Sequence, residues 1–269
     1  MQFPEAISSL DPVTQLYVSI DASTKDTLKA IDRPLFKDFW ERFISSLDSL
    51  RDKGQRTVYR LTLVKSYNMD EVKNYCDLIR RGNPDLIEIK AVTYCGTSDG
   101  SDLTMKDVPF HQEVRSFCEA IAQEMGGTYG LACEHEHSNC VLLANRCFYR
   151  FPDDVDESGS TVRLVDVEDR FAHLPEGHII RGNDTKDAKG RQGAWFTWID
   201  YNRFHQLVQE YHSSDSCNDF TSKDYVARTP CWSVYNSKEQ GFDPVEERFR
   251  RTKDGKVQEY SAPTEAGCG

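Results

Sequence analysis

Three short apolar runs, each followed by a helix-like stretch, constrain the fold of this chain more than any other feature. They lie at residues 16–21, 58–65 and 86–92, and each ends in polar or charged residues. A strand–helix–strand repeat builds a parallel sheet, and such sheets place ligands at the carboxyl ends of their strands. The sequence therefore predicts an α/β chain whose candidate functional residues lie at these strand ends.

Helical periodicity follows each of these runs. The stretches with one apolar helical face are 36–50, 72–79 and 114–121. Asn68 with Glu71 three residues later forms a capping-box pattern, which predicts that a helix begins there. Two more strands are predicted at 129–133 and 140–144, with a loop at 134–139 between them.

The pattern changes after the fifth predicted strand. Periodicity weakens and Asp, Gly and Arg dominate, which predicts an acidic insertion that is mobile in part. Order is expected to resume with a short aromatic strand and a helix, followed by a disordered polar tail. The predicted divisions are residues 1–148, 149–193, 194–249 and 250–269.

Charge and hydropathy exclude some classes of protein. The net charge of −11 argues against a general nucleic-acid binder, because phosphate neutralisation needs clustered Lys and Arg. No apolar run reaches the length of a membrane span, and the first residues do not resemble a secretory signal. We therefore expect a cytoplasmic protein.

Nine cysteines occur without a single C-x-x-C pair. An odd number of thiols in a chain without a signal peptide is typical of reduced cysteines in the cytosol. Cys133, Cys140 and Cys147 recur every seven residues, with His135 and His137 between the first two. This spacing matches no strong zinc pattern, so no metal site is predicted.

Two pairs of polar residues lie near the ends of the first two predicted strands. Ser19 and Asp21 share a face and are suited to holding a ribose or an amino acid, although the pattern alone favours Asp21 as a cap of the next element. Arg60 and Thr62 share a face of the second strand. A cation inside a barrel needs an anion, which is either a ligand or an internal carboxylate such as Asp21 or Glu88.

The third strand and the later segments add further candidates. Glu88 and Lys90 share a face, so they form a structural ion pair or present a lysine to an anionic or keto-acid substrate. His135 lies in a segment dense in titratable groups, where it is a catalytic group or a solvated loop histidine. The aromatic residues of the last third favour core packing over stacking on unpaired bases. They are Trp195, Trp198, Trp232 and Tyr235.

Several of these stretches, in this order, resemble one family. The segments are DRPLFKDFW (32–40), QRTVYRLTLVK (55–65), IEIK (87–90), LTMKDVP (103–109), CEH (133–135), TWIDY (197–201) and FDP (242–244). They are similar to the tRNA 4-demethylwyosine synthases, which are radical S-adenosylmethionine enzymes. The resemblance runs from about residue 2 to about residue 249, apart from the insertion near 150–193.

The resemblance implies a fold and a reaction. The fold is the C-terminal half of a partial (β/α)6 radical S-adenosylmethionine barrel with a small C-terminal extension. The reaction condenses N1-methylguanosine-37 of tRNA-Phe with carbons from pyruvate to give 4-demethylwyosine, a step of wybutosine biosynthesis. The cofactors are S-adenosylmethionine and a [4Fe–4S] cluster, with FMN in an N-terminal flavodoxin-like domain of eukaryotic members.

The sequence departs from the family in one respect. The family holds its cluster with a C-x-x-x-C-x-x-C run, and no such run occurs here. We therefore expect this chain to be a C-terminal fragment that is inactive alone. It should expose a strand edge at which the N-terminal half of the barrel would pair.

The resemblance also implies roles for residues, transferred by their strand positions. The cofactor-binding candidates are Ser19, Asp21, Arg60, Thr62 and Asn68, the substrate-binding candidates are Glu88 and Lys65, and the catalytic candidates are Lys90 and His135. Residues 194–249 are expected to help place the tRNA. Two alternatives remain: a non-catalytic module that binds tRNA or a protein, and an aldolase-like enzyme with Lys90 as its Schiff base.

Overall fold

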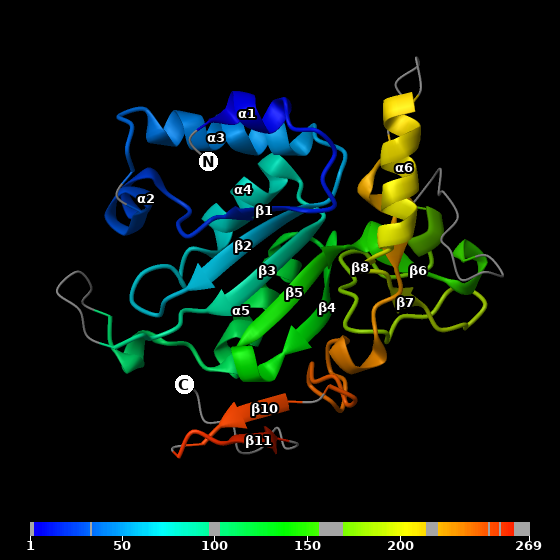
Figure 1. Ribbon diagram of the computed structural model, residues 1–269. Coiled ribbons are helices and arrows are strands. Elements are labelled where there is room, and N and C mark those ends of the chain that lie inside the picture. The colour runs from blue at the N-terminus through cyan, green and yellow to red at the C-terminus, as the bar shows by residue number, and fades with distance from the viewer. Residues whose placement is uncertain are drawn as a thin grey trace.

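A five-stranded mixed sheet with helices on one face forms the centre of the molecule (Figure 1). The computed structural model describes residues 3–32, 34–96, 103–155, 169–213, 220–246, 248–252 and 254–260. The strands, in their order across the sheet, are β1 (Leu16–Ser19), β2 (Thr57–Leu63), β3 (Leu86–Ala91), β5 (Cys140–Asn145) and β4 (Tyr129–His135).

The first three strands pair in parallel, as the strand–helix repeat predicts. β5 is antiparallel to both β3 and β4, so the sheet is mixed. The reason is the short connection between His135 and Cys140, because a parallel pairing needs a crossover of about a dozen residues or more. The predicted loop is shorter than expected, since β4 continues to His135 and a 3₁₀ turn, Glu136–Ser138, fills most of the rest.

In the described residues, five helices precede the β4–β5 hairpin. They are α1 (Pro4–Ser8), α2 (Lys25–Asp32), α3 (Phe39–Arg51), α4 (Val72–Gly82) and α5 (His111–Glu124). α3, α4 and α5 lie side by side on one face of the sheet, and α1 packs on α3. α4 ends at Gly82 and is capped by Asn83, whose φ of 42° is the left-handed conformation that terminates helices.

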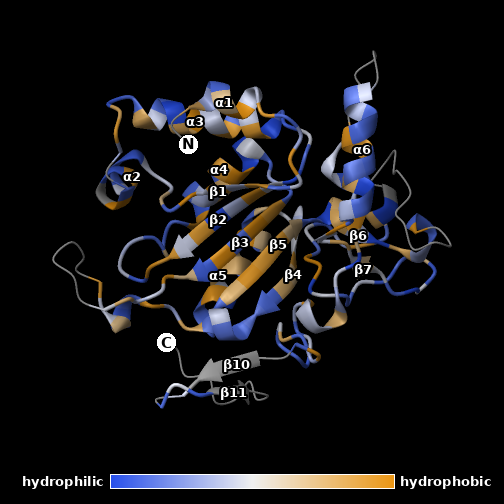
Figure 2. Ribbon diagram, viewed as in Figure 1, coloured by the Kyte–Doolittle hydropathy of each residue, from blue (hydrophilic) through white to orange (hydrophobic). Residues whose placement is uncertain are grey.

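The two faces of the sheet differ because side chains alternate along each strand. Tyr59, Leu61 and Ile89 point to the helices and are fully buried in the main core. Burial of each such side chain contributes about 1.5–3 kcal/mol. Figure 2 shows the resulting concentration of hydrophobic residues along the central strands.

A second hydrophobic cluster covers one end of the opposite face. Val58, Leu86 and Ala144 lie at that end of the sheet and pack with Phe148 and Trp195. Phe148 and Trp195 belong to a part of the chain that we call the C-terminal module. Its elements are β6 (Tyr149–Arg150), β7 (Ala194–Trp195), β8 (Trp198–Ile199), α6 (Tyr201–Ser213) and β9 (Val226–Ala227). α6 projects away from the sheet (Figure 1) and packs through Phe204 and Leu207 in a small cluster of its own.

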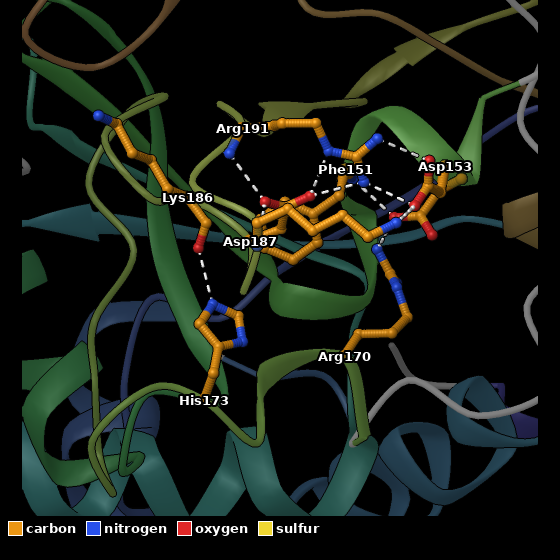
Figure 3. Close-up of polar contacts among 9 residues, drawn as sticks. Phe151, Asp153, Arg170, His173, Lys186, Asp187 and Arg191 are labelled. Atoms are coloured by element: carbon orange, nitrogen blue, oxygen red, sulfur yellow. Dashed lines mark hydrogen bonds and ion pairs between the residues drawn. The ribbon is translucent and has the colours of Figure 1, made fainter.

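Salt bridges connect the described part of the predicted insertion (Figure 3). Arg191 binds Asp153 at 2.6 and 2.7 Å and Asp187 at 2.8 Å, and Lys189 also binds Asp153. Nearby, Nε2 of His173 lies 2.7 Å from the carbonyl oxygen of Lys186. Residues 156–168 of the predicted insertion lie outside the described residues.

The remaining elements are short. The 3₁₀ turns are Met105–Asp107, Glu136–Ser138, Arg146–Phe148, Pro152–Asp154, Asp169–Phe171, Ser222–Asp224 and Cys231–Ser233. β10 (Arg248–Arg251) and β11 (Val257–Tyr260) form a hairpin in the segment that includes the start of the predicted tail, and residues 261–269 lie outside the described residues. Across the described ranges, no helix combines the length and apolar character needed to cross a membrane.

The two edges of the sheet are treated differently. The outer edge of β4 is covered, since Leu131 exchanges backbone hydrogen bonds with Ile180 and Gly182 and the carbonyl of Ala132 accepts from the N–H of Tyr235. Within the described residues, β1 pairs with β2 alone. β1 is therefore an edge strand available for pairing.

Candidate functional site

A row of polar side chains crosses the face of the sheet that the helices do not cover. Ser19, Arg60 and Glu88 are register partners on three adjacent strands, so they lie side by side on this open face. Nε of Arg60 lies 3.4 Å from Glu88, and the hydroxyl of Tyr17 donates to the same carboxylate at 3.1 Å. Of the partners considered for Arg60, Glu88 is thus the one in ion-pair contact.

A second row lies one pleat further toward the carboxyl ends of β1–β3. Thr62 and Lys90 are register partners, and Cys140 follows on β5. Burial raises the pKa of Asp21, while the Thr62 hydroxyl and Arg60 oppose this effect. Lys90 is half-buried, and within the described residues its ammonium has no carboxylate at ion-pair distance. The structure therefore brings Asp21, Arg60, Thr62 and Lys90 to one end of the open face.

Asn68 and Lys65 lie beyond the end of β2 and already have protein partners. The Asn68 side chain is buried, accepts from the N–H of Val64 at 2.8 Å and donates to the carbonyls of Thr62 and Asp21. It is not a helix cap, because α4 begins at Val72, so the predicted start of this helix was wrong. Nζ of Lys65 binds Glu113 at 2.7 Å and lies over the ring of Phe110.

A cavity of about 470 Å³ lies between the open face and the C-terminal module. Tyr17, Glu88 and Leu142 line it from the sheet. Trp198 and Trp232 line it from the module, with their ring centroids 5.8 Å apart and their planes nearly perpendicular. This volume is in the range of sites that hold a small molecule or one unit of a polymer.

Arg56 fixes one wall of this cavity. It is 1% exposed, and its guanidinium donates to the carbonyls of Thr197 at 2.6 Å and Trp198 at 3.1 Å. The backbone N–H of Arg56 donates to the hydroxyl of Tyr225 at 2.8 Å. Because Arg56 directly precedes β2, these bonds fasten the module to the sheet at the point where Trp198 enters the cavity.

His135 lines the opposite side of the cavity, and its ring centroid lies 5.0 Å from that of Phe242. The neighbouring Glu134 is a buried anchor: it lies 3.0 Å from Nε2 of His111 and accepts from the N–H of Asn236 at 2.7 Å. Burial raises the pKa of Glu134, but these hydrogen bonds and Arg115 outweigh it and leave the pKa lowered.

The sequence patterns did not single out Arg56, and they included Glu134 only as part of a titratable segment. An arginine at the start of an apolar strand, and a glutamate at the end of one, were the available signals. Trp198 and Trp232 were interpreted as core, yet Trp198 is 47% exposed at the cavity.

The cysteines are dispersed over the fold. Cys76 and Cys118 are buried in the main core, Cys133 and Cys140 line the cavity, and Cys147 belongs to the second cluster. Among the residues that the structure describes, no group of three or more His, Cys, Asp or Glu side chains is arranged to hold a metal ion.

Comparisons with known proteins were made for the sequence and for the fold. A family described as wyosine base formation matches residues 81–145. The S-adenosyl-L-methionine-dependent tRNA 4-demethylwyosine synthase TYW1 of Danio rerio is 51% identical over 256 residues, which cover 94% of this chain and 29% of the relative. The Homo sapiens protein of the same name is 48% identical over 95% of this chain and 29% of its own length.

A plant relative gives the same result. The S-adenosyl-L-methionine-dependent tRNA 4-demethylwyosine synthase of Oryza sativa subsp. japonica is 48% identical over 94% of this chain and 32% of its own length. A solved structure titled "Structure of TYW1 with a lysine-pyruvate adduct bound" is 29% identical with a TM-score of 0.47, and the match covers 54% of this chain and 45% of that one.

This chain spans about three tenths of the length of the curated relatives that it matches. Within that span the identity is about one half and extends over nearly the whole chain. The predicted resemblance is therefore confirmed: the chain is related to the tRNA 4-demethylwyosine synthases over the segment of those proteins that it matches.

Proposed function

We propose that this chain forms part of the active site of a tRNA 4-demethylwyosine synthase, a cytoplasmic enzyme of wybutosine biosynthesis. The observation that carries the proposal is identity of about one half, across nearly the whole chain, to proteins of that name. The open face supports it, because a polar row and a cavity lie on the one side of the sheet that helices leave uncovered. The substrate would be N1-methylguanosine-37 of tRNA-Phe, and the second substrate pyruvate.

In this proposal the sheet is the C-terminal half of a partial (β/α)6 barrel. β1, β2 and β3 are parallel, their apolar face is under helices, and their polar face is where a barrel interior would lie. An N-terminal half of the same protein would pair with the available edge of β1. The polar rows described above would then be enclosed.

The cofactor proposed for these rows is S-adenosylmethionine. Ser19, Asp21, Arg60 and Thr62 offer hydroxyl, carboxylate and guanidinium groups, which suit its ribose and amino-acid parts. Asn68 contributes by holding the carbonyls of Asp21 and Thr62 in place. When bound, S-adenosylmethionine would supply the radical chemistry at the methyl group of the substrate.

Substrate and catalytic roles are proposed for the neighbouring side chains. Glu88 and Lys65 would bind substrate, and His135 would hold or transfer a proton at the cavity wall. Lys90 would bind pyruvate, because its ammonium is the unpaired cation between Thr62 and Cys140 in the described part of the open face.

The described residues do not fit a [4Fe–4S] cluster. Its family ligands are three closely spaced cysteines, whereas the described cysteines are distributed between two cores, the cavity and the exposed surface and form no metal-binding group. We therefore assign the cluster, and the FMN of eukaryotic relatives, to the N-terminal half, and derive no step from either.

A segment exchange tests this function. The matching 256 residues of the Danio rerio relative are replaced by this chain, and tRNA-Phe from cells that lack the native enzyme is analysed by mass spectrometry. The chimera is expected to produce 4-demethylwyosine, and this chain alone is expected to produce none. A folded chimera that cleaves S-adenosylmethionine but makes no product would favour a non-catalytic binding module.

Borohydride trapping tests the role of Lys90 in the same chimera. Labelled pyruvate is expected to become attached to the protein, and the Lys90→Ala variant is expected to lose the label. Lys25→Ala is the matched control, since Lys25 is exposed, is paired with Glu41 and has no proposed role at the site. Undiminished labelling of the Lys90→Ala chimera contradicts this assignment.

A further inference from the structure

Three of the exposed aromatic side chains in the described residues gather at one place. Tyr17, Trp198 and Tyr201 are 49%, 47% and 59% exposed, and all three line the cavity between the open face and the C-terminal module. Large apolar rings exposed to water together mark a binding surface more often than isolated ones do. The cavity is therefore built for a ligand with flat, apolar faces.

The walls of the cavity are held in position by buried contacts. Arg56 fixes the backbone at Trp198, and β8 pairs Trp198 with Ala227. The carbonyl of Trp232 accepts from the Ser237 hydroxyl at 2.7 Å and from the N–H of Gly241 at 3.0 Å. The two indoles are thus preorganised, with their planes nearly perpendicular.

One carboxylate, that of Glu88, determines which polar groups of a ligand can bind in the cavity. Glu88 accepts from Tyr17 and is paired with Arg60, and these two partners leave acceptor sites free on a group that has about four. Burial, together with Glu88, raises the pKa of Tyr17 to about 12, so its hydroxyl keeps its proton and remains a donor at neutral pH. A ligand that meets Glu88 must therefore present hydrogen-bond donors, such as N–H groups, and no negative charge.

We infer that this cavity receives one unpaired purine base of the RNA substrate, with its ring stacked on Trp198 and its exocyclic amino group donating to Glu88. The choice of RNA rests on the proposed function; the stacking and the donor requirement rest on the cavity itself. Base stacking on aromatic side chains is the usual way in which proteins hold single-stranded RNA. Among purines, guanine and adenine carry an exocyclic amino group and hypoxanthine does not.

Short labelled RNAs test this inference with the full chain and no cofactor. Three oligouridines are compared by fluorescence anisotropy: one with a single guanosine, one with inosine in its place, and one of uridine alone. The guanosine RNA is expected to bind about fivefold more tightly than the inosine RNA, which lacks one hydrogen bond. Equal affinity for all three RNAs overturns the inference.

Variants separate stacking from a general loss of structure. Trp198→Ala is expected to weaken guanosine RNA binding by about tenfold, whereas Trp198→Tyr keeps a ring and most of the affinity. Glu88→Ala is expected to abolish the preference for guanosine over inosine. Phe3→Ala is the control, because Phe3 is 61% exposed next to α1, which packs on α3 in the helix layer, and should leave binding unchanged.

The outcomes distinguish this inference from the proposed function. If the chimera is active and its Trp198→Ala variant keeps the parental kcat/KM for tRNA, the cavity does not hold the base and the function stands. If the chain prefers guanosine RNA through Trp198 and Glu88 but the chimera is inactive, the cavity inference stands and the function falls. Retained binding by a folded Trp198→Ala chain also overturns the inference.

Discussion

Within the described residues, Arg150 is a buried cation without a carboxylate at ion-pair distance. It is 2% exposed, and its Nε and Nη1 have no hydrogen-bond partner in the part of the chain that the structure describes. Burial lowers its pKa, and the nearby Arg170 lowers it further. The buried carboxylate of Asp154 is instead bound to Arg170. The fold therefore carries an unfavourable charge that packing of the second cluster must offset.

Arg150→Met is expected to leave the free energy of unfolding unchanged or raise it by about 1 kcal/mol, because it removes a charge that has no ion pair and keeps the volume. Arg170→Met is the matched control and is expected to lower stability by about 3 kcal/mol, since it leaves Asp154 buried without its partner. Urea denaturation measures both. Equal losses in the two variants would mean that Arg150 makes a stabilising contact.

The protonation of Asp85, which lies just before β3, makes the stability of the folded state depend on pH. Its carboxylate accepts from the N–H of Thr57 and the hydroxyl of Ser222, both at 3.0 Å, and burial raises its pKa to about 6 despite these bonds and Arg56. The folded state therefore holds this proton more tightly than the unfolded state does. The stabilising effect is complete below the ordinary aspartate pKa and is lost as pH rises through about 6.

Asp85→Asn is expected to become more stable relative to the parent chain as pH rises from about 4 to about 7, by up to about 3 kcal/mol. The amide keeps an acceptor for Thr57 and does not ionise. Denaturation at each pH gives the difference between the two proteins, which removes the contribution of other titrating groups. A difference that is constant across this range would show that Asp85 ionises normally.

At the scale of elements, Gly241 joins the module to the end of β4. Its φ is +92°, and a Cβ at this position would overlap the carbonyl oxygen of Glu134. The neighbouring backbone bond runs from the N–H of Glu136 to the carbonyl of Gln240. Only glycine satisfies both the left-handed conformation and this close approach.

Gly241→Ala is expected to lower the free energy of unfolding by at least about 3 kcal/mol, because strain and overlap add together. Gly190→Ala is the control: its φ of +79° imposes similar strain, but open space surrounds its Cβ. We expect a loss of about 1 kcal/mol there. Thermal melts of the two variants that coincide would show that the segment at 241 moves to make room.

The elements that sequence patterns predicted well are those whose own side chains decide them. β2 and β3 are apolar on the helix side, and α3 and α5 have one apolar face, so their periodicity was sufficient. The capping-box pattern of Asn68 and Glu71 predicted the wrong helix start. The Asn68 amide binds backbone groups at the end of β2 and does not cap a helix. That outcome depends on contacts between distant segments, which a local pattern does not contain.

Local sequence patterns predicted the residues that line the cavity only in part, for the same reason. Glu88 and His135 were predicted as site residues, and both line it. The position of Trp198 depends on a hydrogen bond from Arg56, 142 residues away in the chain. Spacing within one segment carries no information about such a contact, so the aromatic wall was interpreted as core.

At the scale of the whole molecule, charge separates two ways of binding RNA. The chain carries a net charge of −11, and on the open face Arg60 is already paired with Glu88. Phosphate contacts need clustered free cations, whereas base stacking needs aromatic surface. In the inferred complex the RNA is therefore held by a base, with little help from the phosphates.

This balance predicts a weak salt dependence of RNA binding. For single strands the logarithm of the affinity falls with that of the salt concentration at a slope of about −0.7 for each phosphate neutralised. With one or two phosphate contacts the expected slope is about −1. Trp198→Ala should reduce the affinity at every salt concentration and leave this slope unchanged. Anisotropy titrations of the guanosine RNA over a range of potassium chloride concentrations give both quantities. A slope steeper than about −3 would show that a basic surface, and not the aromatic cavity, dominates the interaction.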